Sequence, residues 1–108
     1  MNPQTQLSAL SAAAPNREPA ARRLVKICNQ KGLHARAAAR FIKMASQFKA
    51  EVTVRKNGTA VSGRSIMGLM MLAASSGTVV QVAATGPDAA AAVEALARLI
   101  ESKFDEQD

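Results

Sequence analysis

One short segment in the middle of the chain constrains the fold more than any other. Glu51–Arg55 alternates polar and apolar side chains, which is typical of a strand with one buried face. Asn57-Gly58 follows closely, and this dipeptide is the strongest short signal for a hairpin, because both central positions of that turn require a positive φ. Ala60–Ser62 is then the returning strand, so an antiparallel pair is expected at the centre of the chain.

Strands and helices alternate along the rest of the chain. Besides the hairpin, we expect strands at Leu24–Cys28 and Thr78–Ala83, and helices from His34 to about Phe48, from Ile66 to about Ala74, and from Gly86-Pro87-Asp88 through a buried stripe that ends at Phe104. The order βαββαβα predicts an α+β fold. In this fold, an open-faced two-layer sandwich, three helices lie on one face of a four-stranded, mainly antiparallel sheet.

At 108 residues the chain has room for one domain. Residues 1–22 are rich in Ala, Ser and Pro, so we expect a flexible N-terminal extension there and the folded domain over residues 23–108. No apolar run approaches the roughly 18 residues that a membrane span requires, and no basic residue precedes the apolar stretch at residues 7–14, as it would in a secretory signal. With its one free cysteine, Cys28, the protein is expected in the cytoplasm.

Composition disfavours several kinds of function. A single cysteine and a single histidine exclude an internal disulfide framework and metal sites built from several thiolates or imidazoles, so no metal or cofactor is expected. They also disfavour a hydrolase of ordinary design. Three Phe, with no Trp or Tyr, provide few platforms on which the bases of a nucleic acid could stack. Binding, carrying or regulating are the functions that remain.

Charge is distributed unevenly along the chain. The formal net charge is +6, yet eleven Lys or Arg and a single acid lie between Arg22 and Arg64, whereas six acids and two bases follow from Ser65 onward. A basic half of this kind predicts an acidic partner, which could be a protein surface, a phosphate group or nucleic acid. The charge pattern alone leaves this choice open.

The segment Gly32–Arg36 holds the only histidine, at the start of a predicted helix. Backbone N–H groups in a first helical turn have no intrahelical partner and suit an anion, and the positive helix end disfavours a cationic imidazole. We therefore expect a mostly neutral His34 with a free ring nitrogen that can act as a nucleophile, and Arg36 within reach of a phosphoryl group on that ring. The alternative is that His34 only caps the helix or packs against the sheet.

Two further groups of side chains predict a docking face. They are three methionines of the second predicted helix and three cations on one face of the first: Met67, Met70 and Met71, and Arg36, Arg40 and Lys43. The second helix is apolar nearly all round, so part of it should be exposed, and methionine side chains adapt to several partners. Core packing and simple solvation are the alternatives, and we favour a docking face for acidic partners.

Residues 23–108 resemble the phosphocarrier HPr of the bacterial phosphotransferase system. The resemblance depends on Gly32–Arg36, on Ser65–Met70 and on Ala84–Pro87 before the last helix, together with the order of the elements. It covers about four-fifths of the chain and includes two separate motifs at consistent spacing. We therefore expect the fold and the function of that family.

The resemblance assigns roles to three residues. It implies that His34 becomes a phosphohistidine at Nδ1, the pros nitrogen, by transfer from Enzyme I, which takes the group from phosphoenolpyruvate. It implies that Arg36 supports the phosphate and that EIIA-type acceptor proteins receive it. Ser65 matches the serine that a dedicated HPr kinase/phosphorylase modifies in many members, and it is also expected to cap the second helix.

Two details distinguish the chain within this family. Ala37 stands where many members have proline, and this residue and the ending Phe104-Asp105-Glu106 resemble nitrogen-branch and proteobacterial carriers more than sugar-uptake ones. We predict a monomeric phosphocarrier that is a substrate of other proteins rather than an enzyme, with no membrane or nucleic-acid partner. The alternative is a basic protein- or nucleic-acid-binding module that works without phosphotransfer.

Overall fold

The computed structural model describes residues 19–106. Along these residues run β1 Ala21–Lys26, α2 Ala35–Ala45, β2 Glu51–Lys56, β3 Thr59–Ser62, α3 Ile66–Met71, β4 Val79–Thr85, α4 Ala89–Glu101 and the 3-10 turn η2 Lys103–Asp105. The predicted order βαββαβα is confirmed. Within the described residues, no helix is both long enough and apolar enough to cross a membrane.

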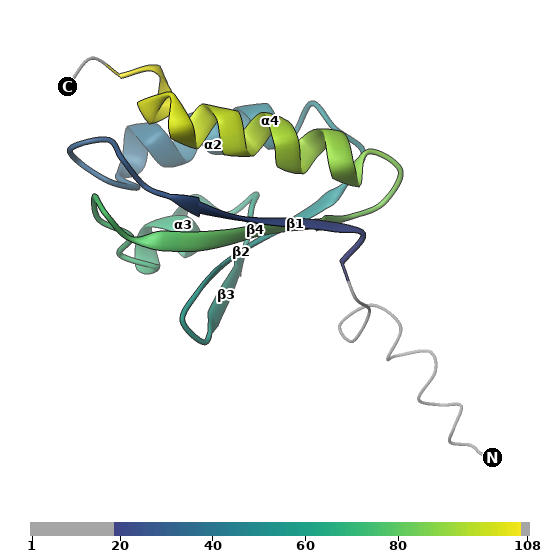
Figure 1. The fold of residues 1–108 in the computed structure, drawn as a ribbon, viewed down its shortest axis with the longest axis horizontal. Helices are drawn as coiled ribbons and strands as arrows, with labels where there is room; N and C mark the ends of the chain where they lie inside the picture. The colour runs from purple at the N-terminus through teal and green to yellow at the C-terminus, as the bar shows by residue number, and fades with distance from the viewer. Residues whose placement is uncertain (1–18, 107–108) are drawn as a thin grey trace.

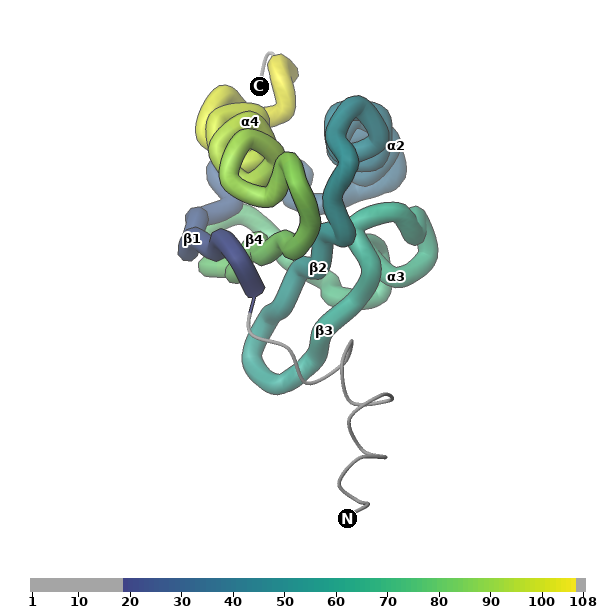
Figure 2. The backbone as a smooth tube through the Cα atoms, turned by 90° about the vertical axis from the view of Figure 1, so that its right-hand side faces the viewer, coloured from purple at the N-terminus to yellow at the C-terminus, as the bar shows by residue number. Residues whose placement is uncertain are grey.

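The four strands form one sheet in the order β1-β4-β2-β3, and every pairing in it is antiparallel. Figures 1 and 2 show α2 and α4 side by side over one face of this sheet, while α3 lies next to β3 and α2. The prediction of an open-faced two-layer sandwich is therefore confirmed.

The core lies between the sheet and the helices. Alternate strand residues point into it, as the hairpin pattern predicts, and helical side chains meet them from above. The largest fully buried apolar side chains are Ile27, Phe41, Val52, Val54, Leu69, Val80, Val82, Leu96, Ile100 and Phe104. Their removal from water is the main contribution to stability in a domain of this size.

Several element boundaries differ from the predicted ones. β1 begins at Ala21, two residues before the predicted start of the domain, because its backbone pairs with β4 as far as Ala84. Residues 1–18 of the predicted extension lie outside the described residues. α3 ends at Met71 rather than near Ala74, because Ala73 has a φ of 52° and leaves the helical conformation.

The last helix also begins later than predicted. Asp88 is its N-cap residue rather than part of the first turn, and its carboxylate accepts a hydrogen bond from the backbone N–H of Lys49 at 2.7 Å. At the other end, Phe104 is fully buried as predicted but lies beyond α4, because Lys103–Asp105 have φ values of 62°, 55° and 60°. The chain therefore reverses after α4.

The turn of the hairpin differs from the prediction in one residue. Asn57 has a φ of 53°, whereas Gly58 lies outside the left-handed region. Only the first central position therefore has a positive φ. Two-residue hairpin turns exist in a form that needs only this position to be left-handed, so the strands still pair from Lys56 opposite Thr59 onward.

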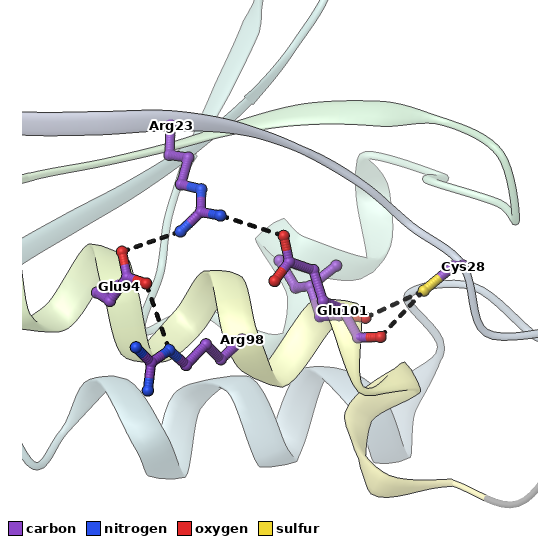
Figure 3. Close-up of polar contacts among 6 residues, drawn as sticks. Arg23, Cys28, Glu94, Arg98 and Glu101 are labelled. Atoms are coloured by element: carbon purple, nitrogen blue, oxygen red, sulfur yellow. Dashed lines mark hydrogen bonds and ion pairs between the residues drawn. The ribbon is translucent and has the colours of Figure 1, made fainter.

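Polar contacts fasten α4 to β1 and to the residues just after β1 (Figure 3). Arg23 pairs with Glu94 at 2.9 Å and with Glu101 at 3.3 Å, and Arg98 also reaches Glu94. The thiol of Cys28 donates to the carbonyl groups of Ile100 and Glu101. These contacts hold the end of α4 beside the chain that leaves β1.

The loop between β1 and α2 depends on a glycine. Gly32 has a φ of +66°, and a Cβ at this position would lie 2.5 Å from the carbonyl oxygen of Ala74 and 2.8 Å from Cα of Ser75. The approach is close because the backbone N–H of Leu33 donates to that same oxygen at 2.9 Å. A side chain at position 32 would have to push the two backbones apart.

We expect Gly32→Ala to destabilise the fold more than Gly77→Ala does. Both glycines have a positive φ, +66° and +94°, so an alanine costs about 1–2 kcal/mol in backbone conformation at either position. Only at Gly32 does the new Cβ collide with backbone, which should add about 1–3 kcal/mol, since nothing lies within 4 Å of it at Gly77. Urea titrations measure both free energies of unfolding, and equal losses would contradict the packing argument.

Candidate functional site

His34 is the N-cap residue of α2, where its backbone is extended, with φ −83° and ψ −178°. Its N–H donates to the carbonyl oxygen of Gly32 at 2.9 Å, and its own carbonyl oxygen accepts from Ala38 at 2.8 Å. The predicted position at the start of a helix is confirmed. The imidazole makes no capping hydrogen bond, so the first-turn N–H groups of α2 stay available to an anion.

The imidazole instead bonds a carboxylate from the far end of the chain. Nε2 of His34 lies 2.6 Å from Oε2 of Glu106, with 25% of the histidine side chain and 11% of the glutamate side chain exposed. An ionised carboxylate only accepts hydrogen bonds, so the proton between them belongs to Nε2. No group within residues 19–106 hydrogen-bonds Nδ1, which is then the unprotonated nitrogen of the neutral ring.

The carboxylate of Glu106 is kept ionised by its neighbours. Burial opposes its charged form, but hydrogen bonds from His34 and Asn29, with favourable electrostatic interactions with His34 and Arg40, outweigh burial and lower the pKa of Glu106 below its ordinary value of 4.5. Asn29 Nδ2 donates to Oε1 of Glu106 at 3.0 Å. Both carboxylate oxygens are therefore engaged.

Asn29 is fully buried and links this carboxylate to the loop before the helix. Its Nδ2 also donates to the carbonyl oxygen of Gly32 at 2.8 Å. Its Oδ1 has no partner within the described part of the chain. Exchanging the two amide atoms would turn Oδ1 toward two acceptors, so the observed orientation is the favourable one. An unpaired buried oxygen costs free energy.

The two arginines predicted on the first helix have different surroundings. Arg36 is exposed in the first turn of α2, and no carboxylate of the described residues pairs with its guanidinium. Arg40 is half-buried, and its Nη1 donates to the carbonyl oxygen of Phe104. This contact gives Arg40 a structural part that the charge pattern did not predict. Lys43 is exposed.

Ser65 is the N-cap of α3, as predicted, and its Oγ accepts from the N–H of Gly68 at 2.9 Å. The three predicted docking methionines of this helix are exposed by 68%, 41% and 76%: Met67, Met70 and Met71. Leu69 and Leu72 bury the opposite side. The prediction that part of this apolar helix is exposed is therefore confirmed.

No pattern in the sequence predicted Asn29 and Glu106 as members of the site. Glu106 lies 72 residues from His34 along the chain, and no local pattern connects the two positions. Buried Phe104 was the available signal, because it implies that the chain stays packed almost to its C-terminus. Among residues 19–106, no group of three or more His, Cys, Asp or Glu could hold a metal ion.

The chain is similar to known proteins over most of its length. A family model described as "PTS HPr component phosphorylation site" matches residues 21–102. Phosphocarrier protein HPr of Neisseria meningitidis serogroup A is 54% identical over 82 residues, which are 76% of this chain and 92% of that protein. Phosphocarrier protein NPr of Shewanella violacea is 43% identical over 84 residues, which are 78% and 92% of the two chains.

Solved structures agree with the sequence relatives. The crystal structure of HPr-C-His from Thermoanaerobacter tengcongensis superposes with a TM-score of 0.78 at 44% identity, covering 82% of this chain and 99% of that chain. The crystal structure of the phosphocarrier protein HPr from Bacillus anthracis superposes with a TM-score of 0.69 at 38% identity, covering 72% and 93%. The chain is therefore similar to HPr proteins in its fold as well as in its sequence.

The contacts of Glu106 predict a direction for the pH dependence of stability. Because its pKa is lowered on folding from 4.5, its stabilising effect is complete above pH 4.5 and is lost as the pH falls through the lowered value. We expect Glu106→Gln to cost about 1–2 kcal/mol near neutral pH, and the gap between parent and variant to close in that acidic range. Urea titrations across this range measure the gap, and a constant gap would contradict the prediction.

Proposed function

Because this chain belongs to the HPr family of the bacterial phosphotransferase system, we propose that His34 is the residue that carries its phosphoryl group. Members of this family are phosphocarrier proteins rather than catalysts, and this chain is a phosphocarrier. One observation carries the proposal for His34. The only imidazole of the chain lies at the N-terminus of α2 with Nε2 bonded and Nδ1 without a partner among residues 19–106.

Nδ1 is the nitrogen that accepts the group in this proposal. It has the lone pair of the neutral ring, since the proton lies on Nε2 toward Glu106. A phosphoryl group on Nδ1 is a dianion, and the first-turn N–H groups of α2 and the guanidinium of Arg36 are suited to bind it. With 25% of the His34 side chain exposed, the group would be held moderately and could pass on.

Family members act in a relay with Enzyme I and EIIA-type proteins. For this chain we propose that both kinds of partner dock on one surface, formed by the exposed methionines of α3 and cations of α2: Met67, Met70, Met71, Arg40 and Lys43. Exposed apolar side chains beside cations favour a partner with an acidic rim. The protein would act in the cytoplasm as a monomer.

Ser65 would be a regulatory site, the target of an HPr kinase/phosphorylase. Its hydroxyl is half-buried and accepts a hydrogen bond from Gly68. A phosphate at the first residues of a helix is tolerated, because unpaired N–H groups and the helix dipole favour an anion there. The same phosphate lies next to exposed Met67, so it would oppose docking of an acidic partner.

We expect His34→Ala to accept no phosphoryl group while the domain keeps its fold. The imidazole makes one side-chain hydrogen bond, to Glu106, and is not part of the core, so its loss removes the nucleophile and that contact but leaves the core intact. Mass spectrometry after incubation with Enzyme I and phosphoenolpyruvate measures the adduct, and circular dichroism checks the fold. Label on the parent should be acid-labile and alkali-stable. A complete adduct on the alanine variant would refute the assignment.

We expect Arg36→Ala to slow phosphoryl transfer by about 10-fold or more, because its guanidinium would stabilise charge on the transferring group. Its free energy of unfolding should change by no more than about 0.5 kcal/mol, since the side chain is exposed. Arg98→Ala, which removes another exposed arginine from α4, is the matched control. Initial rates with the same Enzyme I measure the effect, and equal rates in both variants would exclude Arg36 from the site.

We expect Ser65→Asp to slow labelling of His34 severalfold without unfolding the domain, while Ser65→Ala is labelled like the parent. Aspartate adds one negative charge to the docking surface and can still cap α3. If repulsion dominates, the inhibition shrinks as salt rises. Labelling rates at low and high salt test this, with circular dichroism as the control for folding. Equal rates for all three proteins at every salt concentration would leave Ser65 a helix cap only.

A further inference from the structure

The segment after α4 contributes the carboxylate of Glu106 to the site, and no local sequence motif predicts this contribution. We propose that Glu106 is a positioning residue for phosphoryl transfer: it holds His34 in the Nε2–H tautomer and stabilises the imidazolium that forms as Nδ1 bonds phosphorus. This inference rests on the proposed role of His34. It concerns a contact of 2.6 Å between Oε2 of Glu106 and Nε2 of His34.

The tautomer decides whether the nucleophile is ready. A neutral imidazole carries one proton, and only its unprotonated nitrogen has a lone pair that can attack phosphorus. A carboxylate that accepts from Nε2 places the proton there and leaves Nδ1 unprotonated. Without the carboxylate, the proton could occupy either nitrogen, and the molecules with a proton on Nδ1 would be inactive as acceptors.

The carboxylate is held in place from three directions. Asn29, in the loop before α2, donates to its other oxygen at 3.0 Å. Two residues before Glu106, the fully buried ring of Phe104 anchors the C-terminal segment in the core. Arg40 of α2 donates to the carbonyl oxygen of Phe104. The position of Glu106 is therefore set by the core and by two neighbouring elements, as a positioning role requires.

Asn29 joins the two parts of the chain that meet at this site. Its Nδ2 donates both to the carbonyl oxygen of Gly32, in the loop before His34, and to Oε1 of Glu106. One fully buried amide therefore fixes the carboxylate relative to the backbone beside the imidazole.

The charge of Glu106 also matters during the transfer itself. The lone pair of Nδ1 forms the new N–P bond, while the bond from phosphorus to the donor atom breaks and its electron pair stays with the donor. The proton on Nε2 remains in place, so the ring becomes cationic next to the carboxylate. When the group moves on, the N–P pair returns to Nδ1 and the ring is neutral again. A buried carboxylate beside a catalytic histidine acts in the same way in serine proteases.

Glu106→Gln tests the proposal, because an amide can either accept from or donate to Nε2 and carries no charge. We expect the initial rate of phosphoryl acceptance from Enzyme I to fall about 10-fold. In ¹⁵N NMR spectra of the neutral imidazole, the parent should be the Nε2–H tautomer and the variant a mixture of both tautomers. Glu106→Asp, which keeps the charge, should recover part of the rate.

Glu101→Gln is the matched control, since it removes one charge from an exposed glutamate near the end of α4. It should change neither the rate nor the tautomer. Glu106→Gln with the parent's rate and tautomer would overturn the proposal and leave His34 as the carrier. A parent whose neutral His34 is mainly Nδ1–H would overturn it even if the variant failed to fold. A parent that takes no label on His34 would remove the proposed function itself.

Discussion

The approach of Gly32 to the backbone of Ala74 is the constraint on which the site depends. A left-handed glycine lets the loop after β1 lie against the chain after α3, where Leu33 bonds the same carbonyl oxygen and is itself buried. The next residue is His34, and α2 begins directly after it. The backbone thus places His34 at the start of α2, and the contact with Glu106 then orients its ring.

Most of the fold and half of the site could be predicted from local patterns. Alternation in β2, the turn after it and the glycine before His34 are signals within a few residues. The phosphocarrier function, which the resemblance of Gly32–Arg36 and Ser65–Met70 to the HPr family implied, is confirmed in preference to a binding module without phosphotransfer. The cap formed by Ser65 is local in the same sense. Boundaries were less predictable, because Asp88 bonds Lys49 across the fold rather than its own helix.

The other half of the site could not be predicted, because it depends on how the chain ends. Three successive residues after α4, Lys103–Asp105, have positive φ although none is glycine. Their intrinsic preference is for a continued helix. The buried stripe that ends at Phe104 likewise predicts that α4 continues to this residue. Burial of Phe104 after a reversed turn overrides that preference, and this tertiary effect brings Glu106 back to His34.

The two edges of the imidazole have opposite surroundings, and a relay needs this asymmetry. At one edge Nε2 faces a carboxylate whose side chain is only 11% exposed, while the histidine side chain keeps 25% of its surface accessible. Nδ1 has no hydrogen-bond partner among residues 19–106, so a partner protein could approach it without displacing the carboxylate at Nε2. Because the carboxylate is ionised, it would stabilise the cationic ring of the phosphorylated state more than the neutral ring, and it would therefore assist the arrival of a phosphoryl group. Positioning at Nε2 and transfer at Nδ1 would allow the proposed carrier residue to act as acceptor and then as donor.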